Sequence, residues 1–393
     1  MNIKGFTFSA VEAAIKKPGR KDLALIFSEV PAVCAAAFTR NKVKAAPVLL
    51  GQERVAGGVL RAVVVNSGNA NACTGEPGLE AARETARLVA EAVDLPESEV
   101  VPSSTGVIGV QMPMERVKAA IPSLVKGLAD GTLDDVARAI MTTDTFPKVA
   151  SRHGSSGGKA YTVAGVAKGA GMIRPDMATM LSFIVTDAVV EPEFLRSCFL
   201  AAVDSSFNCI TVDNDMSTND TALIMANGMA GNVPIDATSP DASEFVRLLG
   251  EVTLDLAKAI VKDGEGATKF VTIKVCGAAS DRDARVAAMA VANSPLVKTA
   301  FFGQDANWGR ILAAVGYSGS EVDQTRVSLF FDDVQMVSGG LFVGGDAEAR
   351  GSAVLHNPEF CVTIDLGLGD GCATVYTSDF SYDYVKINAD YRT

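Results

Sequence analysis

Histidine is nearly absent from this chain of 393 residues, and its scarcity narrows the available chemistry. The two histidines are His153 and His356, and neither lies in a G-x-S-x-G segment or beside a cysteine. A Ser-His-Asp or Cys-His mechanism would have to use one of them. Two histidines are also too few for a histidine-rich metal site. If the chain is a hydrolase or an acyl transferase, we expect its general base to be a group other than histidine.

Basic clusters, long apolar runs and closely spaced cysteine pairs are also missing. The formal net charge is −11, and no block of lysine and arginine offers a footprint for a phosphate backbone, so we expect no nucleic-acid partner. No apolar run approaches the length of a membrane span, and the first 22 residues lack the apolar centre of a signal peptide. The seven cysteines form no C-x-x-C pair, which is typical of reduced thiols. We therefore expect a cytoplasmic protein without a membrane association.

The length and composition predict a large, mostly aliphatic core. Hydrophobic residues make up 48% of the chain and aromatic residues only 6%, and a chain of this length can form two domains. Apolar periodicity predicts strands over residues 60–66, 163–166, 180–185, 221–225, 270–276, 326–331, 361–366 and 372–377. It predicts helices over residues 78–93, 113–128, 133–141, 191–205, 240–262 and 281–293.

Three further segments have patterns that predict a helix break, a loop and an edge strand. Pro122 lies within the helix expected over residues 113–128, and we expect the helix to break there because proline lacks a backbone donor. Residues 151–158 read Ser-Arg-His-Gly-Ser-Ser-Gly-Gly, which predicts a mobile surface hairpin loop. Residues 383–393 alternate in polarity, which predicts an edge strand.

A threonine stands at the joint between a glycine-broken turn and an apolar strand. Thr179 follows Ala178 and precedes the run from Met180 to Val185. A cut between Ala178 and Thr179 would give Thr179 a free α-amino group with a reference pKa of roughly 7.7–8.0, so part of it is an uncharged base near neutral pH. The nucleophile and its general base would then come from one residue. On pattern alone, a threonine that simply begins a buried strand is the commoner arrangement.

Other segments of the first half carry groups that suit ligand chemistry. Lys168-Gly-Ala-Gly is similar to a phosphate-binding loop, but it lacks the spacing and the terminal Lys-Ser/Thr of a P-loop. Residues 100–109 run from a strand into a small-residue turn, where backbone N–H groups and the Thr105 hydroxyl suit an oxyanion hole. An ordinary strand-end turn is the default for this pattern. The hydroxyls of residues 142–145 by default bond the last carbonyls of the preceding helix.

Acidic residues of the second half offer two further candidates. Glu265 lies in a glycine-lined corner just past a predicted helix. It can be solvated there, or it can meet a ligand amine. Asp213, Asp215 and Asp220 cluster within eight residues, but they lack the spacing and the closing glutamate of an EF-hand loop. We expect no metal site.

Eight separated segments together resemble the ornithine acetyltransferase family, also called glutamate N-acetyltransferase. They occur in order and span nearly the whole chain. The segments are Asn66-Ser-Gly-Asn-Ala-Asn-Ala72, Ser104-Thr-Gly-Val-Ile-Gly109, Met141-Thr-Thr-Asp-Thr145, Lys168-Gly-Ala-Gly-Met-Ile-Arg-Pro-Asp-Met-Ala-Thr-Met-Leu181, Ser217-Thr-Asn-Asp220, Asp263-Gly-Glu-Gly-Ala-Thr268, Asn307-Trp-Gly-Arg310 and the terminus 384–393. Two positions depart from the family pattern: Asn214 stands where glycine is expected, and Ala306 stands where proline is expected. Both departures affect loop geometry rather than the residues that carry chemistry.

The resemblance implies an architecture and a maturation step. The family has an α/β fold of its own, with mixed sheets sandwiched between helices. Its precursor cleaves itself before the nucleophilic threonine, here between Ala178 and Thr179. The implied chains are an α chain of residues 1–178 and a β chain of residues 179–393. They remain associated, usually as an α2β2 heterotetramer.

The resemblance also assigns roles residue by residue. Thr179 is the implied nucleophile, and Thr105 and Gly106 match the oxyanion-hole pair. The implied substrate-binding positions are Thr142, for which Thr143 is a close alternative, together with Lys168, Thr179, Glu265, Asn388 and Thr393.

The implied reaction is ping-pong acetyl transfer in the recycling step of arginine biosynthesis. Thr179 Oγ attacks the acetyl group of N2-acetylornithine while its own amine accepts the proton, ornithine leaves, and glutamate then takes the acetyl group. Lys168 is suited to pair with a substrate carboxylate, and Glu265 is suited to bind a substrate ammonium. The resemblance implies no cofactor. Some members of the family also accept acetyl-CoA as donor, and no motif indicates whether this chain does.

Two alternatives belong to other classes of protein. One is an N-terminal-nucleophile aminopeptidase or amidase, in which water replaces glutamate as the acceptor; hydrolysis of a short peptide would identify it. The other is an uncleaved small-molecule-binding protein that uses the glycine loop at Lys168. An intact polypeptide without covalent acetylation would identify that one.

Overall fold

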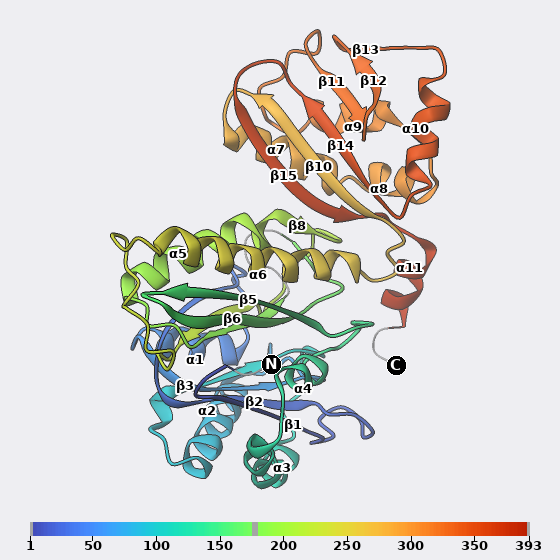
Figure 1. Cartoon of the computed structure of the whole chain (residues 1–393). Coiled ribbons are helices and arrows are strands. Elements are labelled where there is room, and N and C mark those ends of the chain that lie inside the picture. The colour runs from blue at the N-terminus through green and yellow to red at the C-terminus, as the bar shows by residue number, and fades with distance from the viewer. Residues whose placement is uncertain (1–2, 175–179, 391–393) are drawn as a thin grey trace. The chain divides into compact units, whose positions relative to one another are not determined.

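The computed structural model describes residues 3–174 and 180–390, and these residues divide into two compact units (Figure 1). The first unit contains the described residues up to Asn208 together with Asp215–Ile260. The second contains Cys209–Asn214 and the described residues from Val261 onward. Each unit has its own mixed sheet and its own apolar core. The α/β class with mixed sheets packed against helices is thereby confirmed.

An eight-stranded mixed sheet forms the centre of the first unit. Its order is β4-β3-β2-β9-β7-β6-β5, with β1 paired to β2 off this path. The pairs β2–β9 and β6–β7 are antiparallel, whereas β7–β9 is parallel. The strands are β1 (Phe6–Val11), β2 (Leu23–Phe38), β3 (Val59–Asn66), β4 (Val100–Ser104), β5 (Lys148–Ser156), β6 (Lys159–Lys168), β7 (Leu181–Thr186) and β9 (Thr221–Ala226).

The two strands in the middle of this sheet are buried along their whole length. Every residue of β7 and of β9 is buried, as expected for strands that are covered on both faces and rich in apolar side chains. The register pairs Leu181 of β7 with Lys168 of β6 and with Thr221 of β9. The end of β6 and the beginnings of β7 and β9 therefore meet at one end of the sheet.

Six helices in the described residues belong wholly or mainly to the first unit. They are α1 (Ala46–Val55), α2 (Gly75–Ala92), α3 (Met114–Lys126), α4 (Leu133–Ala139), α5 (Pro192–Ser205) and α6 (Ala242–Lys262), the last two residues of α6 lying in the second unit. The helix α6 runs across β5 and β6 (Figure 1). Phe245 of α6 packs against Tyr161 of β6, with ring centroids 6.0 Å apart. Its apolar face thus covers the polar-edged hairpin of β5 and β6.

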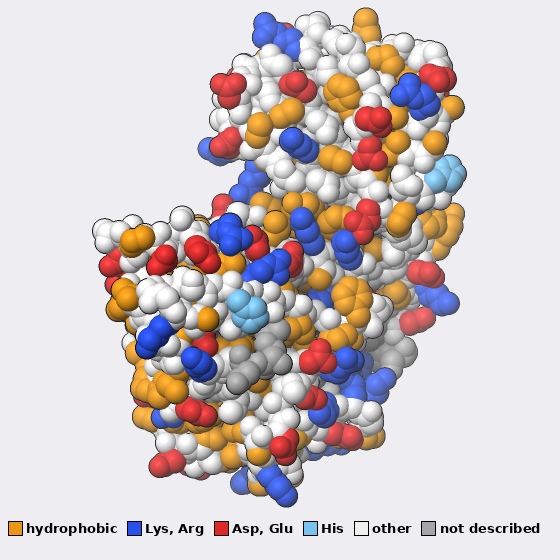
Figure 2. Space-filling view, in the orientation of Figure 1, with side chains coloured by type: hydrophobic (Ala, Val, Ile, Leu, Met, Phe, Trp, Pro, Cys, Tyr) orange, Lys and Arg blue, Asp and Glu red, His pale blue; other side chains and the backbone are white. Residues whose placement is uncertain are grey.

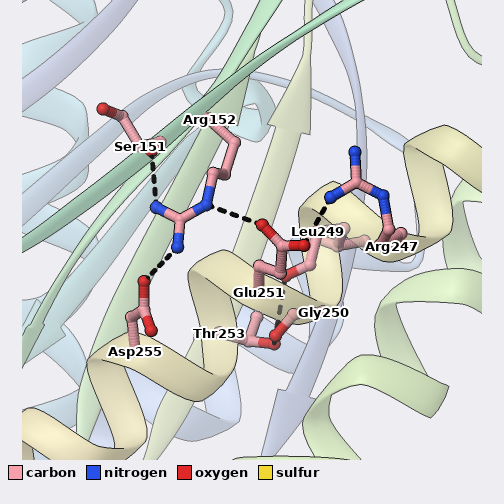
Figure 3. Close-up of polar contacts among 8 residues, drawn as sticks. All are labelled: Ser151, Arg152, Arg247, Leu249, Gly250, Glu251, Thr253 and Asp255. Carbon is pink, nitrogen blue, oxygen red and sulfur yellow. Dashed lines mark hydrogen bonds and ion pairs between the residues drawn. The ribbon is translucent and has the colours of Figure 1, made fainter.

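An ion-pair network also joins α6 to β5 (Figure 3). Arg152 donates from Nε to Glu251 Oε2 at 2.7 Å and from Nη2 to Asp255 Oδ2 at 2.5 Å. Glu251 also accepts a hydrogen bond from Arg247, one helical turn earlier. All of these side chains are substantially exposed, so water screens their charges and the network adds little stability. The network links α6 to β5 at the surface of the first unit.

Two local predictions for the first unit are wrong. Residues 151–156 lie in β5 and pair with β6 in regular antiparallel register, so only the turn at Gly157 and Gly158 remains of the predicted mobile loop. Pro122 lies inside α3, which continues to Lys126 without a break. The carbonyl left without its donor belongs to Lys118, on the exposed side of the helix. Water can satisfy that carbonyl, so the helix tolerates the proline.

The second unit is built on a seven-stranded sheet with the order β13-β12-β11-β14-β10-β15-β8. Its strands are β8 (Ile210–Thr211), β10 (Phe270–Ala278), β11 (Ser328–Phe331), β12 (Val334–Ser338), β13 (Leu341–Phe342), β14 (Glu359–Asp365) and β15 (Gly371–Ser378). Its helices are α7 (Asp281–Ala292), α8 (Pro295–Phe302), α9 (Trp308–Gly316), α10 (Ala347–Leu355) and α11 (Tyr382–Ala389).

The alanine-rich helix α7 packs against this sheet. Ser280 caps it by accepting the N–H of Asp283, as the sequence predicts. Its buried alanines have no exposed surface and belong to the same apolar core as the β10 and β15 side chains. The single tryptophan, Trp308, stacks on Phe342 with ring centroids 5.4 Å apart, which confirms its structural role.

The edge strand predicted at the C-terminal end is wrong, because Tyr382–Ala389 forms helix α11. Ser381 caps this helix by accepting a hydrogen bond from the Tyr384 N–H at 3.4 Å. One turn further on, Asn388 Nδ2 donates to Tyr384 O at 3.0 Å. The alternating polarity of this segment therefore reflects a short, mostly exposed helix rather than one face of a sheet.

The surface agrees with the acidic but mixed composition of the chain. Acidic and basic side chains are interspersed on the face drawn in Figure 2 rather than separated into one basic region. Within residues 3–174 and 180–390, no helix combines the length and the apolar character needed to cross a bilayer.

Candidate functional site

Two small-residue loops face each other at the ends of β3 and β4 in the first unit. The strands run parallel and pair Asn66 with Ser104 at their ends. Asn66 joins the loops, because its side chain accepts a hydrogen bond from Ser104 Oγ at 2.5 Å and donates to Asn69 O at 2.8 Å. The Thr105 N–H donates to Asn66 O at 3.0 Å. Since this backbone donor is already used, the group that Thr105 can offer a ligand is its hydroxyl.

Gly106 occupies a position that excludes any side chain. Its φ is +136°, in the region that favours glycine. A Cβ at this position would lie 2.3 Å from the carbonyl carbon of Gly68 and 2.5 Å from the nitrogen of Asn69. The close approach of the two loops therefore requires glycine at the second of the two predicted oxyanion-hole positions.

Asn219, two residues before β9, holds both loops in place. Its side-chain Nδ2 donates to Ala70 O at 2.6 Å and to Ser104 O at 2.8 Å, and the residue is buried. One amide therefore fixes both the loop after β3 and the residue before Thr105. The segment around Asn219 is one of those that resemble the family, but no role was predicted for this residue. The signal was a buried polar tetrapeptide directly before an apolar strand.

Lys168 is buried at the end of β6, beside Thr105. Its Nζ lies 3.4 Å from Thr105 Oγ1, and only 4% of the residue is exposed. Both residues line a small cavity with Met180, Leu181, Ser217, Asn219 and Asp220. Met180 directly follows Thr179 in the sequence. Ala178 and Thr179, the predicted cleavage site and nucleophile, lie outside the described residues.

A buried carboxylate links Lys168 to Thr142. Asp144 Oδ1 accepts hydrogen bonds from Lys148 Nζ at 2.7 Å and from the Gly169 N–H at 2.8 Å. Asp144 Oδ2 accepts the Thr142 N–H at 2.9 Å. Burial alone would raise the pKa of the Asp144 carboxyl, but the charges of Lys168 and Lys148 and these hydrogen bonds lower it to about 2. Asp144 is therefore ionised at any pH near neutrality.

Asp144 and Lys148 are site residues that were not predicted from the sequence. The prediction for residues 142–145 was a helix end whose hydroxyls bond the last carbonyls. In the structure the segment follows α4, and its carboxylate reaches the backbone at the end of β6 instead. A lysine four residues after an aspartate was visible in the sequence, but that spacing points to an ion pair only within a helix.

The second unit brings together two other predicted site residues. Asn388 of α11 donates from Nδ2 to Glu265 Oε2 at 2.8 Å. Glu265 is buried, with 8% of its surface exposed. The neighbouring Gly266 has a φ of +68°, and a Cβ there would lie 2.5 Å from the Tyr384 nitrogen. The glycine thus lets the Glu265 loop approach α11 closely. Thr393, the remaining predicted residue, lies outside the described residues.

The chemistry offered by these residues suits an acyl transfer. In the first unit, the Thr105 hydroxyl and the buried Lys168 ammonium line one cavity, and Gly106 directly follows Thr105. Such donors stabilise a developing oxyanion, and an ammonium pairs with a carboxylate. In the second unit, a buried glutamate held by an amide can bind an ammonium.

Comparison with known proteins gives matches over the whole chain. Residues 7–393 match the ArgJ family. The arginine biosynthesis bifunctional protein ArgJ of Geobacter sulfurreducens is 69% identical over 393 residues, with 100% of both chains covered. That of Syntrophotalea carbinolica is 56% identical over the same length, again with 100% of both chains covered. The crystal structure of the arginine biosynthesis bifunctional protein argJ from Bacillus halodurans is 40% identical with a TM-score of 0.52, and the match covers 54% of this chain and 99% of that chain.

Proposed function

The chain belongs to the ArgJ family, and from this premise we propose a mechanism in which Thr179 carries the acetyl group from N2-acetylornithine to glutamate. The family assignment makes the chain an acetyltransferase of arginine biosynthesis. It favours this activity over both alternatives, the aminopeptidase or amidase and the uncleaved binding protein.

The observation that carries the mechanism is the cavity at the end of β6. Thr105 and Lys168 line it together with Met180, and Met180 is bonded directly to Thr179. The proposed nucleophile is therefore bonded to a residue of a cavity that is also lined by a hydroxyl donor and an ammonium group. A free α-amine on Thr179 would supply the general base, as required in a chain with only two histidines.

The reaction proceeds in two balanced halves. Thr179 Oγ attacks the acetyl carbonyl carbon, and the Thr179 amine takes the hydroxyl proton. The Thr105 hydroxyl and the Gly106 N–H donate hydrogen bonds to the resulting oxyanion. The C–N bond then breaks, the proton passes to the departing ornithine nitrogen, and acetyl-Thr179 remains. The α-amino group of glutamate attacks this ester, loses a proton to the Thr179 amine, and leaves as N-acetylglutamate as Thr179 regains its hydroxyl proton.

Two charged residues supply the binding of the substrates. Lys168 pairs with a substrate carboxylate, because its ammonium is buried on the cavity beside Thr105. Glu265 binds the side-chain ammonium of N-acetylornithine, because it is a buried carboxylate oriented by Asn388. Thr142, Thr179, Asn388 and Thr393 complete the proposed set of substrate-binding residues.

Sheet topology supports a lasting association of the two proposed chains. Cleavage between Ala178 and Thr179 would separate residues 1–178 from residues 179–393. The strands β7 and β9 of the second chain lie between β2 and β6 of the first. Their backbone ladders and their complete burial would hold the chains together after the cut. We propose an α2β2 heterotetramer in the cytoplasm, for which light scattering should give about twice 40.8 kDa.

Donor choice is a separate proposal. The acetyl group arrives on a substrate, so the mechanism uses no resident cofactor. The curated relatives are described as bifunctional, which supports acetyl-CoA as a second donor to glutamate. Release of free CoA thiol in the presence of glutamate would establish this second activity, and its absence at saturating acetyl-CoA would rule it out.

The intact mass of the purified protein under denaturing conditions tests the mechanism first. Dividing 40.8 kDa in proportion to chain length gives expected fragments of about 18 and 22 kDa, the larger beginning at Thr179. Thr179→Ala should leave one full-length chain without transferase activity. Thr179→Ser, which keeps a hydroxyl, is the matched control and should still be cleaved. Normal cleavage or turnover in the alanine variant would exclude Thr179 as the nucleophile.

A further inference from the structure

We propose that Asp144 and Lys148 are positioning residues that hold Thr142 and Lys168 for substrate binding. The inference rests on the proposed function, because it concerns the same cavity and the same substrates. Neither residue has a role among those that the family resemblance implies.

Every oxygen of the Asp144 carboxylate contacts a segment of the site. Oδ2 accepts the N–H of Thr142 at 2.9 Å, and Oδ1 accepts the N–H of Gly169, the residue after Lys168, at 2.8 Å. One carboxylate thus ties the loop after α4 to the end of β6. Lys148, whose Nζ lies 2.7 Å from Oδ1, completes the arrangement from the first residue of β5. Moving Asp144 would displace two substrate-binding positions at once.

The burial of this pair argues against a role in stability alone. Both side chains have no exposed surface. Removing two charges from water is unfavourable, and an apolar pair of the same volume often stabilises a fold equally well or better. A buried ion pair therefore indicates a positioning role when its hydrogen bonds hold segments that apolar side chains could not hold. Asp144 accepts hydrogen bonds from three donors, two of which are backbone N–H groups of the site.

Electrostatics gives the pair a second effect on Lys168. Among the described residues, the charged groups near Lys168 include Asp144 and Lys148 and, from the segment just before β9, Asp220 across the cavity. The lysine charges help hold the pKa of Asp144 at about 2, so Asp144 is a fixed negative charge during catalysis. Neutralising Asp144 should make Lys168 release its proton at lower pH. Neutralising Lys148 should have the opposite effect, because it removes a like charge.

Two nearly isosteric variants test the proposal, Asp144→Asn and Lys148→Met. Each should raise the KM of both substrates on the order of 10-fold or more, with a smaller change in kcat, because Thr142 and Lys168 are displaced rather than removed. The alkaline limb of kcat/KM should move to lower pH in Asp144→Asn and to higher pH in Lys148→Met. If the substitutions only reduced stability, the alkaline limb would move in the same direction in both variants or stay at its wild-type position in both.

The control is Glu97→Gln, which removes the ion pair between Glu97 and the buried Arg54 in the same unit. It should leave the KM of both substrates unchanged. KM values within twofold of wild type in soluble, cleaved Asp144→Asn and Lys148→Met would overturn the proposal. If Asp144→Asn is insoluble, Lys148→Met decides: a raised KM supports the proposal and an unchanged KM overturns it. The rate of the wild-type enzyme tests the proposed transferase activity. An inactive wild type would contradict the proposed function, whereas an active wild type with unchanged KM values in both variants would contradict only the role of Asp144 and Lys148.

Discussion

Asn388 donates a hydrogen bond from its side-chain amide to Glu265 Oε2 at 2.8 Å, and thereby joins the last described helix to the loop that follows α6. The two residues are more than 120 positions apart in the chain. The amide also donates to Tyr384 O at 3.0 Å, which fixes its orientation within α11. Glu265 consequently presents a carboxylate whose position depends on the C-terminal helix.

Replacing Asn388 by alanine should therefore weaken binding of the substrate that carries a side-chain ammonium. Loss of a hydrogen bond to a charged group is worth about 1.5–3 kcal/mol, and the exposure of Asn388 favours the lower end, so KM for N-acetylornithine should rise roughly 10-fold. KM for glutamate, which lacks that ammonium, should change less. Steady-state kinetics with each substrate varied in turn measures both effects. Lys386→Ala, on the same exposed helix, is the control, and equal changes for both substrates would contradict the assignment.

The glycine loop offers a matched pair of substitutions. Gly106→Ala would place a Cβ 2.3 Å from Gly68, so two backbone loops would have to separate. Gly109 also has a positive φ, but a Cβ there meets nothing within 4 Å. Gly109→Ala should therefore lower stability by only about 1–3 kcal/mol and keep near-normal turnover. Gly106→Ala should lose both cleavage and turnover.

The intact mass and the initial rate of both glycine variants decide the point. Equal maturation and equal rates would show that the close approach at Gly106 has no catalytic consequence. A loss confined to Gly106→Ala would place the oxyanion hole at the contact between the loops after β3 and β4.

Most strands and helices were predictable because their patterns are local. The run from Met180 to Val185 is apolar and β-prone, and β7 covers nearly the same residues, Leu181–Thr186. Ser280 caps α7 as its sequence indicates. The failures arose where tertiary contacts outweigh local pattern. Residues 151–156 read as a loop because they are polar, yet β6 pairs with them along their length.

The residues of the site also divide into those that a sequence motif predicts and those that only tertiary contacts identify. Thr105, Gly106 and Lys168 could be named because their segments match a family pattern, and the structure places them together. Asn219 and Asp144 act through hydrogen bonds to backbone atoms far away in the sequence. No spacing rule identifies such partners, because they depend on how the ends of β4 and β6 and the segment before β9 come together in the folded first unit.

The hydroxyl of Thr105 is the only donor of that residue left for an oxyanion. Its backbone N–H is bonded to Asn66, so a role in the oxyanion hole depends on Oγ1. Thr105→Val keeps the shape of the side chain and removes the donor, and should slow turnover by about 10²–10³-fold, equivalent to about 2.7–4 kcal/mol. Thr105→Ser keeps the hydroxyl and should retain most of the activity. Single-turnover acetylation of the enzyme measures the step directly, and equal rates in the two variants would exclude the hydroxyl from catalysis.

Lys298 of α8 is a fully buried lysine in the second unit, and its environment makes the stability of that unit depend on pH. Lys298 of α8 donates to Thr377 Oγ1 at 2.9 Å and to the backbone oxygen of Ser378, and its Nζ lies 4.7 Å from the centre of the Phe380 ring. Burial lowers its pKa from 10.5 to about 7, against the opposing charges of Asp379 and Asp213. The folded protein therefore binds fewer protons than the unfolded chain between about pH 7 and pH 10.5. Stability of this unit should rise with pH across that window.

Lys298→Met should remove this pH dependence. The charged lysine destabilises the folded state fully below pH 7, by about 4–5 kcal/mol, and the penalty disappears as pH rises toward 10.5. Urea unfolding followed by the fluorescence of Trp308, the only tryptophan and a residue of the same unit, measures the effect. Between pH 6.5 and pH 9.5 the wild-type midpoint should rise relative to that of Lys298→Met, whereas the exposed Lys274→Met should follow wild type. Parallel curves for wild type and Lys298→Met would show that Lys298 titrates as an ordinary lysine.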